Sequence, residues 1–443
     1  MKNSMTEGNE LKAVVLFAIP LLIGNIFQQI YSFVDAVIVG NYIGSDALAE
    51  VGASGSTVSL LILLLMGFTN GASILIAQSY GRKAGNEICR TVSGLYTIIF
   101  VFSLVLGLIG YLLSEWILNL MNTPEELLKD AATYLKIMFV GVPAVAIYNA
   151  QASIVRNMGK SIMPLVVLII SSITNVALDL VFVVNLGMGV EGVGYATLIS
   201  QILSALISSV YILTDKERLM LTDLKMGIAG IEDYKSIFKM GIPTAFQSSI
   251  ITIGSMCIQS LVNSFGKTTM AAYTAVNKID TIAIQIVVSL GISVSVFAGQ
   301  NIGAGKKDRI KKLVREMVLL QIIVCSLVAA IIVLNRENIL RLFISQDSEE
   351  VVRIGSTYIT IICVAYVSAG IMQTFLNALK GAGDILFSMR VGIIEVGIRI
   401  VVAFILSRLL SSEVGIWIAT PVAWITACLC TIFRYRKGVW EKG

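Results

Sequence analysis

Long apolar runs separated by short polar segments follow one another along the chain from residue 13 to residue 433. Each run has about 20 residues or more, which is the length that an α-helix needs to cross the hydrocarbon core of a bilayer. We therefore predict twelve membrane-spanning helices and an all-α fold. The expected ranges are 13–39, 52–77, 92–113, 133–155, 162–184, 191–213, 238–264, 270–298, 313–333, 351–377, 386–407 and 413–433.

Composition agrees with this pattern. Of the 443 residues 56% are hydrophobic and 14% are charged, whereas soluble domains are about 25% charged. The first run, 13–39, is too long for the core of a signal peptide and carries Asp35 deep inside, so we expect it to remain as the first helix. The composition indicates one continuous membrane domain with the lipid bilayer as its surroundings.

The positions of the 33 Lys and Arg residues predict the orientation. Most of them fall in the termini and in the loops that share one side of the membrane, including the only long charged connection, 214–237. Because cytoplasmic loops are enriched in Lys and Arg, we expect both termini and this linker to be cytoplasmic.

The two halves of the chain repeat. Matching positions recur in the same order at an offset of 222 to 224 residues, and each half has an even number of predicted spans. We therefore expect two parallel six-helix lobes, 1–213 and 238–443, related by an axis along the membrane normal. The matching pairs are Gly44 and Gly266, Gln78 and Gln300, Gly81 and Gly303, Arg156 and Lys380, and Thr197 and Thr420.

Histidine is absent, and the six cysteines show neither CxxC pairs nor metal-ligand spacing. We interpret the cysteines as small apolar residues and expect no disulfide and no structural metal. A proton carrier working near neutral pH must then be a carboxylate, since the side chain that usually titrates there is missing.

Segments along the whole chain resemble the multidrug and toxic compound extrusion (MATE) transporters, in the branch of small bacterial efflux pumps. The resemblance is carried by FAIPLLIGNIFQQIYSFVDAVIVGNYIG, GIPTAFQSSI, AAYTAVNKID, GQNIGAG and LKGAGD. It implies two six-helix lobes around a V-shaped cavity in the bacterial cytoplasmic (inner) membrane, working by alternating access. It also implies a multidrug efflux antiporter that exchanges protons or sodium ions for small organic, often aromatic cations.

Two carboxylates lie within predicted spans of the first half. Tyr31 precedes Asp35 by four residues, and Asn175 precedes Asp179 by the same spacing, so each helix presents a carboxylate and a neutral polar group on one face. Together with Thr197 these positions match the cation-coupling site that the resemblance implies. Two acids close together in a low-dielectric site cannot easily both be ionised, which predicts a proton or a sodium ion between them, the latter held by Asp35, Asn175, Asp179 and Thr197.

The second half has a different set of intramembrane charges: Lys278, Asp280, Glu395 and Arg399. Glu395 and Arg399 stand four residues apart, so we expect an ion pair along one helix face, in a charge network that holds the second lobe together. A role in binding substrate or relaying protons stays open. We also expect Asn25, Gln28 and Gln247 to line the cavity, because lipid would not accept such polar side chains.

Other functions remain to be weighed. A lipid or lipid-linked sugar flippase, or an exporter of a natural metabolite, would use the same fold. Asp35 with Asp384 loosely resembles the motif pair of intramembrane aspartyl proteases, but Asp384 belongs to a predicted basic turn, so we expect no enzyme. The chain lacks a GxxxxGK[ST] loop, so we expect no ATP-driven pump on this chain. We expect no cofactor besides the coupling ion, no nucleic-acid partner and a monomer.

Overall fold

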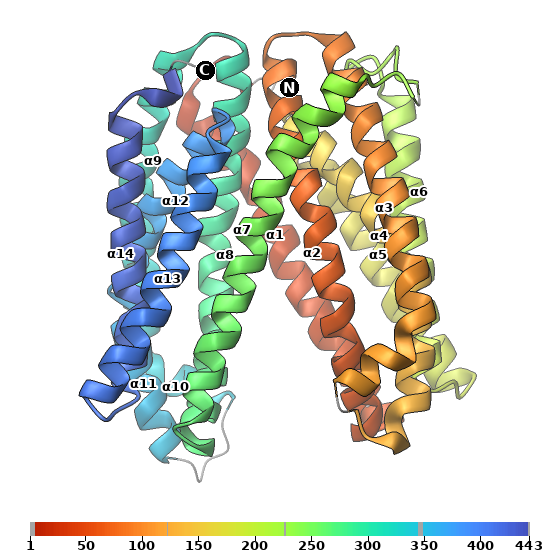
Figure 1. The fold of residues 1–443 in the computed structure, drawn as a ribbon, viewed down its shortest axis with the longest axis vertical. Coiled ribbons are helices and arrows are strands. Elements are labelled where there is room, and N and C mark those ends of the chain that lie inside the picture. Colours follow the sequence, from red (N-terminus) through yellow and green to blue (C-terminus); the bar gives the residue numbers. More distant parts are fainter. Residues whose placement is uncertain (1–4, 122, 226, 344–348, 442–443) are drawn as a thin grey trace. The chain divides into compact units, whose positions relative to one another are not determined.

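The computed structural model describes residues 5–121, 123–225, 227–343 and 349–441, and these residues form helices joined by short loops (Figure 1). In the first half the α-helices are α1 (Glu10–Ile38), α2 (Ser45–Gly81), α3 (Gly85–Leu120), α4 (Glu125–Asn157), α5 (Ile162–Asp179) and α6 (Val190–Thr214). In the second half they are α7 (Ile231–Asn263), α8 (Lys267–Gly303), α9 (Lys307–Leu334), α10 (Arg336–Arg341), α11 (Glu349–Cys363), α12 (Tyr366–Gly381), α13 (Ile385–Leu409) and α14 (Val414–Arg436).

Among the described residues, ten helices are long and apolar enough to cross a membrane. The bent pair α11 and α12, which meet at 44°, qualifies together as an eleventh span. Helix α13 has 25 residues, but Arg390, Glu395, Arg399 and Arg408 are spread along it, so it contains no long stretch with fewer than three charges and is not among the ten. With α13 counted, each of the twelve predicted runs corresponds to a helix or a bent helix pair, and the all-α polytopic fold is confirmed.

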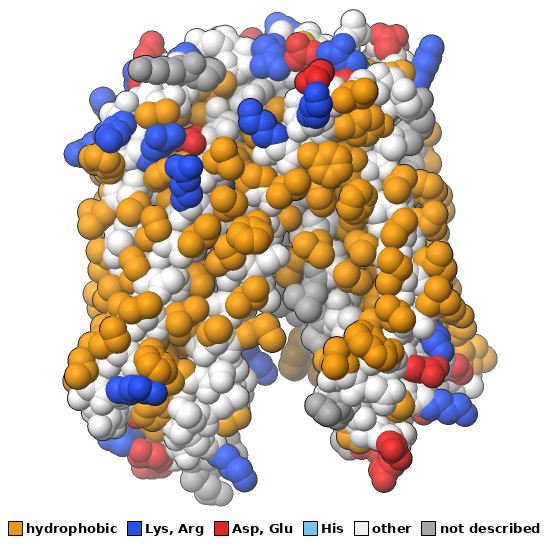
Figure 2. All heavy atoms as spheres, viewed as in Figure 1, with side chains coloured by type: hydrophobic (Ala, Val, Ile, Leu, Met, Phe, Trp, Pro, Cys, Tyr) orange, Lys and Arg blue, Asp and Glu red, His pale blue; other side chains and the backbone are white. Residues whose placement is uncertain are grey.

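The surface agrees with a membrane-spanning arrangement. On the face drawn in Figure 2, hydrophobic side chains cover the middle of the helices, while Lys, Arg, Asp and Glu side chains gather toward the helix ends. Such a belt is expected where helices face lipid, because charged groups are costly within the hydrocarbon region.

The backbone repeats as the sequence predicts. Left-handed backbone conformations, which favour glycine, occur at corresponding turns of the two halves. The paired positions, with φ in degrees, are Gly44 (126) and Gly266 (92), Lys83 (59) and Gly305 (71), and Gly159 (85) and Gly383 (96).

The described residues pack into two compact units, whose limits differ from those of the predicted lobes. The first-half unit is Ile19–Ala245, and the second-half unit comprises Met1–Ala18 and Phe246–Gly443. The beginning of α1 belongs to the second-half unit because Glu10 forms ion pairs with Arg309 (3.0 Å) and Lys312 (2.8 Å). Helix α1 therefore begins in one unit and continues in the other, and the change falls beside Pro20.

Helix α7 also belongs to both units: it begins in the first-half unit and continues in the second-half unit. Its beginning packs closely on α2. A Cβ atom added at Gly71 of α2 would lie 2.5 Å from the backbone nitrogen of Gly241, and one added at Gly67 would lie 2.3 Å from the Cβ atom of Ala245. The two helix backbones meet through glycines, which assigns the first turns of α7 to the first-half unit.

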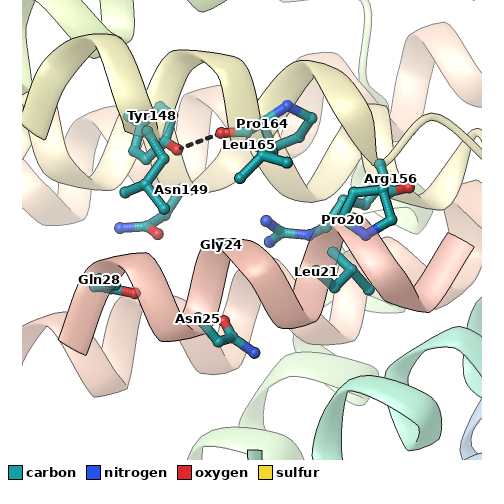
Figure 3. A pocket seen from close by; sticks show the side chains of 12 residues that line it. Pro20, Leu21, Gly24, Asn25, Gln28, Tyr148, Asn149, Arg156, Pro164 and Leu165 are labelled. Carbon is teal, nitrogen blue, oxygen red and sulfur yellow. Dashed lines mark hydrogen bonds between the residues drawn. The ribbon is translucent and has the colours of Figure 1, made fainter. Parts of the chain in front are cut away.

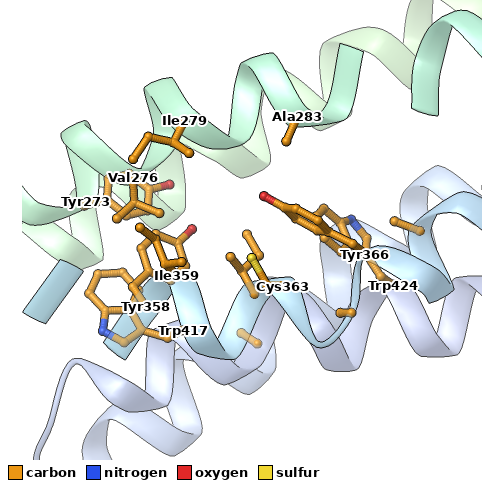
Figure 4. Close-up of a cluster of buried hydrophobic side chains, with 14 of the residues drawn as sticks. Tyr273, Val276, Ile279, Ala283, Tyr358, Ile359, Cys363, Tyr366, Trp417 and Trp424 are labelled. Atoms are coloured by element: carbon orange, nitrogen blue, oxygen red, sulfur yellow. The ribbon is translucent and has the colours of Figure 1, made fainter. Parts of the chain in front are cut away.

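Each unit has its own apolar core. In the first-half unit α4 packs against α2, α3 and α6. In the second-half unit α8, α11 and α14 contribute the rings of an aromatic stack, formed by Tyr273, Tyr358 and Trp417 (Figure 4). The ring of Trp417 lies 4.2 Å from that of Tyr358 and 5.7 Å from that of Tyr273, both nearly parallel to it.

Candidate functional site

The five residues predicted to form a coupling site come together within the first-half unit. Asp35 lies on α1 and Asp179 is the last residue of α5. The side chains of Asp179 and Asn175 are almost completely buried, with 0% and 1% of their surface exposed. Helix α6 supplies Thr197 from the neighbouring face. Helix α1 and the two consecutive helices α5 and α6, which are far from it in sequence, therefore converge on one polar cluster.

Asn175 is the centre of this cluster. In the amide orientation that satisfies both of its polar atoms, Nδ2 donates to Asp179 Oδ2 at 2.9 Å and to Tyr31 Oη at 3.1 Å, while Oδ1 accepts from the Thr197 backbone N–H at 3.2 Å. In the opposite orientation Nδ2 lies 3.4 Å from Thr197 Oγ1. The first orientation gives hydrogen bonds with Asp179, Tyr31 and the Thr197 backbone, so we assign that orientation to the amide. Asn175 then fixes both Tyr31 and one oxygen of Asp179.

The carboxyl groups of Asp35 and Asp179 lie within hydrogen-bonding contact of each other. The Oδ1 atom of each is buried and has no hydrogen-bond partner among the described residues. Two carboxylates in contact repel each other unless a proton or a metal cation lies between them. The arrangement can therefore hold one small cation.

Sequence reasoning missed Tyr134 of α4, whose side chain is 4% exposed and interacts electrostatically with both Asp35 and Asp179. Its position in an apolar run gave no signal, because only the packing of α4 on α1 and α5 brings its phenol to the acids. The buried ring of Tyr134 also lies beside Gly194 of α6, so it helps to exclude water from the acid pair.

Sequence reasoning also missed two π-helical segments beside the acids. One, Val39–Ile43, continues α1 one turn after Asp35, and the other, Leu180–Asn185, begins directly after Asp179. Segments of π-helix are uncommon and are frequently found at functional sites, because the widened turn leaves backbone groups free to rearrange. Both acids thus lie beside a backbone that can change its hydrogen bonding.

The predicted cavity-lining residues separate into two groups. Asn25 and Gln28 line a cavity of about 100 Å3 between α1, α4 and α5 (Figure 3). Gln247, by contrast, is 6% exposed and donates to the backbone oxygen of Ser388 at 3.0 Å. The amide of Gln247 thus pairs with the backbone of α13, as a buried amide needs in an apolar surrounding, and its role in lining the transport cavity stays a prediction.

The charges of the second half do not form the predicted ion pair. No contact of 4 Å or less between Glu395 and Arg399 occurs in the described part of the chain. Arg399 Nη2 instead lies 3.4 Å from Ser255 Oγ of α7, and Glu395 is hydrogen-bonded by Trp424. A shared helix face allowed the pair, but neighbouring helices offered each side chain another partner.

Asp280 and Lys278 also point in different directions. Tyr366 of α12 donates its hydroxyl to Asp280 Oδ1 at 2.8 Å, whereas Lys278 is exposed with its ammonium 5.9 Å from the ring centre of Phe343. Asp384 pairs with Arg434 at 2.7 Å. Among the described residues of the second half, Arg399 interacts electrostatically with both Asp280 and Glu395, but neither of these two acids is in contact with another acid, as Asp35 and Asp179 are.

Within the described residues, no group of three or more His, Cys, Asp and Glu side chains could hold a metal ion, and the six cysteines are free. Among the described residues, Asp35 and Asp179 are the two acids of the helices whose side chains are in hydrogen-bonding contact with each other. Repeated six-helix units, buried acids and lipid-facing helices together define the class of membrane transport proteins.

Comparisons with known proteins identify the family. The MatE family model matches residues 20–181 and again residues 243–405. The probable multidrug resistance protein YoeA of Bacillus subtilis is 31% identical over 97% of this chain and 94% of its own length. The probable multidrug resistance protein NorM of Thermotoga maritima is 23% identical, covering 97% of this chain and 93% of its own. The chain belongs to the MatE family of multidrug efflux transporters.

Solved structures agree on the fold. A crystal structure of MATE in a bent conformation superposes with a TM-score of 0.92 over 100% of this chain and 99% of that chain, at 19% sequence identity. A MOP superfamily transporter from Pyrococcus furiosus superposes with a TM-score of 0.91, at 20% identity, over 100% of this chain and 99% of that chain. The MATE fold expected from the sequence resemblance is therefore confirmed.

Proposed function

We propose that this transporter exports small organic cations in exchange for one proton or sodium ion, which is bound between Asp35 and Asp179. The buried Oδ1 atoms of these two residues support the proposal most directly, because both lack a partner among the described residues. A cation placed there would satisfy both oxygens and remove the repulsion between the carboxylates.

The proposed cycle uses the neighbouring groups as follows. When the outward-facing protein binds the ion, the two carboxyl groups attract it together and Asn175 keeps Asp179 in place. The π-helical segments that follow Asp35 and Asp179 adjust their backbone hydrogen bonds, and the organic cation is released. The inward-facing protein then loses the ion and accepts the next organic cation. We place both termini on the cytoplasmic side of a bacterial cytoplasmic membrane, in accord with the distribution of Lys and Arg.

The stoichiometry has an energetic consequence. Exchange of one monovalent ion for one monovalent organic cation moves no net charge across the membrane. The membrane potential, worth about 2.3 kcal/mol per charge at 100 mV, would then not drive export. Only the concentration gradient of the coupling ion would do so.

Efflux of ethidium from everted membrane vesicles, with pH and sodium gradients imposed separately, tests the proposal. We expect one of the two gradients to drive efflux by the natural chain and neither to drive it in Asp35→Asn at equal expression. Asp280→Asn is the matched control, because it makes the same chemical change at an acid of the second-half unit whose carboxyl is already bonded by Tyr366.

Two results would overturn the proposal. Ion-driven efflux by Asp35→Asn at the rate of the natural chain would remove the acid pair from the coupling step. Efflux that follows the membrane potential when both ion gradients are absent would contradict the one-for-one exchange.

A further inference from the structure

A second polar site lies in the first-half unit, in the cavity between α1, α4 and α5 (Figure 3). Arg156, in the last turn of α4, extends its guanidinium into the space between α1 and α5. The side chains of Asn25, Gln28 and Asn149 supply polar groups at the other end of the cavity, and Leu21 and Leu165 form apolar walls.

Arg156 has no acidic partner in the part of the chain that the structure describes. Among the described residues, no carboxylate lies within 4 Å of its guanidinium, and Tyr148 is the ionisable side chain that interacts with it. Tyr148 itself donates its hydroxyl to the backbone oxygen of Pro164 at 3.3 Å. A guanidinium held in a half-buried cavity between membrane-spanning helices is costly unless an anion compensates it.

Lys160 provides a comparison four residues further along the chain. It forms an ion pair with Asp215, so its charge is compensated within the protein. Lys160 and Asp215 thus compensate each other, whereas no carboxylate among the described residues lies within 4 Å of the Arg156 guanidinium.

The repeat provides a second comparison. Lys380 of α12 occupies the position that corresponds to Arg156, and in the second-half unit it interacts electrostatically with Glu395. The same offset of 224 residues leads from Glu395 to Ser171, which is neutral and donates to the backbone of Leu168. The second half thus supplies an internal anion for this cation, and the first half does not.

We propose that the cavity at Arg156 binds an organic anion, with a phosphate or carboxylate group on Arg156 and a short apolar part against Leu21, Leu165 and Leu168. Arginine suits this role because its planar guanidinium can give two parallel hydrogen bonds to such a group. The volume of about 100 Å3 equals about three water molecules, which suits an anionic headgroup with its first carbon atoms. The anion could belong to a lipid headgroup or to a soluble molecule.

This site is separate from the proposed coupling site. The Arg156 end of the cavity lies beside Pro20, which is fifteen residues before Asp35 on α1, or about 22 Å along a helix. The other end of the cavity, at Gln28, is seven residues before Asp35, or about 10 Å. The two sites also select opposite charges, so an anion at Arg156 would not compete with the cation at the acid pair. The binding experiment below therefore stands or falls independently of efflux.

Binding of radiolabelled n-butyl phosphate to the purified full-length protein in a neutral detergent tests the soluble form of the ligand. Native mass spectrometry with phosphatidylglycerol, compared with phosphatidylcholine, tests the lipid form. We expect saturable binding of at least one of these anions by the natural chain and at least tenfold weaker binding by Arg156→Gln. Arg156→Lys should bind with intermediate affinity, because it keeps the charge but loses the bidentate geometry.

Two further variants keep the test decisive. Lys160→Gln removes an equal charge at a cation that Asp215 already pairs, and should bind within twofold of the natural chain. Leu165→Phe keeps Arg156 but fills part of the cavity, and should weaken binding even if Arg156→Gln does not fold. Absence of saturable binding of both anions, or equal binding by the natural chain and Arg156→Gln, would overturn the proposal.

Discussion

The two six-helix halves share their backbone but differ in the way they hold charge. In the first-half unit two acids lie in contact, and a buried amide fixes one of them. In the second-half unit Asp280 and Glu395 each have a different neutral donor, Tyr366 and Trp424. A repeated scaffold can therefore keep its helix packing while only one copy retains a pair of acids that needs a cation. If this difference between the halves is real, matched substitutions in the two units should have unequal effects.

The largest effect is expected at Asp179. Asp179→Asn removes one of the two carboxylates, so the remaining acid no longer needs a shared cation. We expect ion-driven ethidium efflux to fall at least tenfold at equal expression. Glu395→Gln in the second-half unit should reduce the amount of folded protein more than it reduces efflux per molecule. Equal losses of efflux per molecule in the two variants would contradict the difference between the halves.

The second effect concerns close packing of helix backbones. Gly71→Ala places a methyl group 2.5 Å from the backbone of Gly241, and overpacking of this kind costs about 1–3 kcal/mol. Ser293 occupies the corresponding position in the second half, and Ser293→Ala should be nearly neutral because it only removes an oxygen atom. Thermal unfolding of the two purified variants would measure this difference. A Gly71→Ala variant as stable as the natural chain would show that α7 can move away from α2.

The third effect separates two tyrosines. Tyr366→Phe removes the hydrogen bond to Asp280, and an unsatisfied buried acceptor costs about 1–3 kcal/mol, so we expect lower thermal stability with coupling retained. Tyr31→Phe removes the acceptor of Asn175, and we expect a shift in the ion concentration that gives half-maximal efflux, with a smaller change in stability. A shifted ion dependence in Tyr366→Phe, with lower stability in Tyr31→Phe, would contradict the roles assigned to the two tyrosines.

The smallest effect is expected outside the membrane-spanning helices. The hydrogen bond from Lys160 lowers the pKa of Asp215 below its usual value of 3.8. Because this pKa is depressed in the folded state, the pair stabilises the protein above the ordinary pKa and loses this contribution as the pH falls below it. Asp215→Asn should lower stability by less than about 1 kcal/mol at pH 7 and flatten its decline at acid pH. An unchanged pH profile of thermal unfolding would show that this ion pair does not contribute to stability.

Several site residues could be predicted because their spacing is local. A carboxylate and a polar group four residues apart share one face of any helix, which placed Tyr31 with Asp35 and Asn175 with Asp179. Thr197 came from the family resemblance. Tyr134 could not be found in this way, because its contact with the acids depends on how α4 packs against two other helices.

Where prediction failed, a neighbouring helix offered a better partner than the one along the chain. Arg399 donates to Ser255 and interacts with Glu395 only beyond ion-pair contact, and Gln247 donates to the backbone of α13. The sequence identified Arg156 only as the counterpart of Lys380 in the repeat. That no described acid pairs with it depends on the packing of α1, α4 and α5. Local spacing restricts which side chains can meet but does not choose among the partners that tertiary packing supplies.

The sequence by itself determined the spans, the repeat and the residue types of the acid pair, because bilayer thickness and the cost of buried charge leave few alternatives. Only the tertiary structure decided which charges are compensated. Asp35 and Asp179 meet, Lys380 has Glu395 nearby, and Arg156 is left without an anion. Electrostatic compensation depends on distances of a few ångströms between helices, and these distances follow from packing that no single helix encodes.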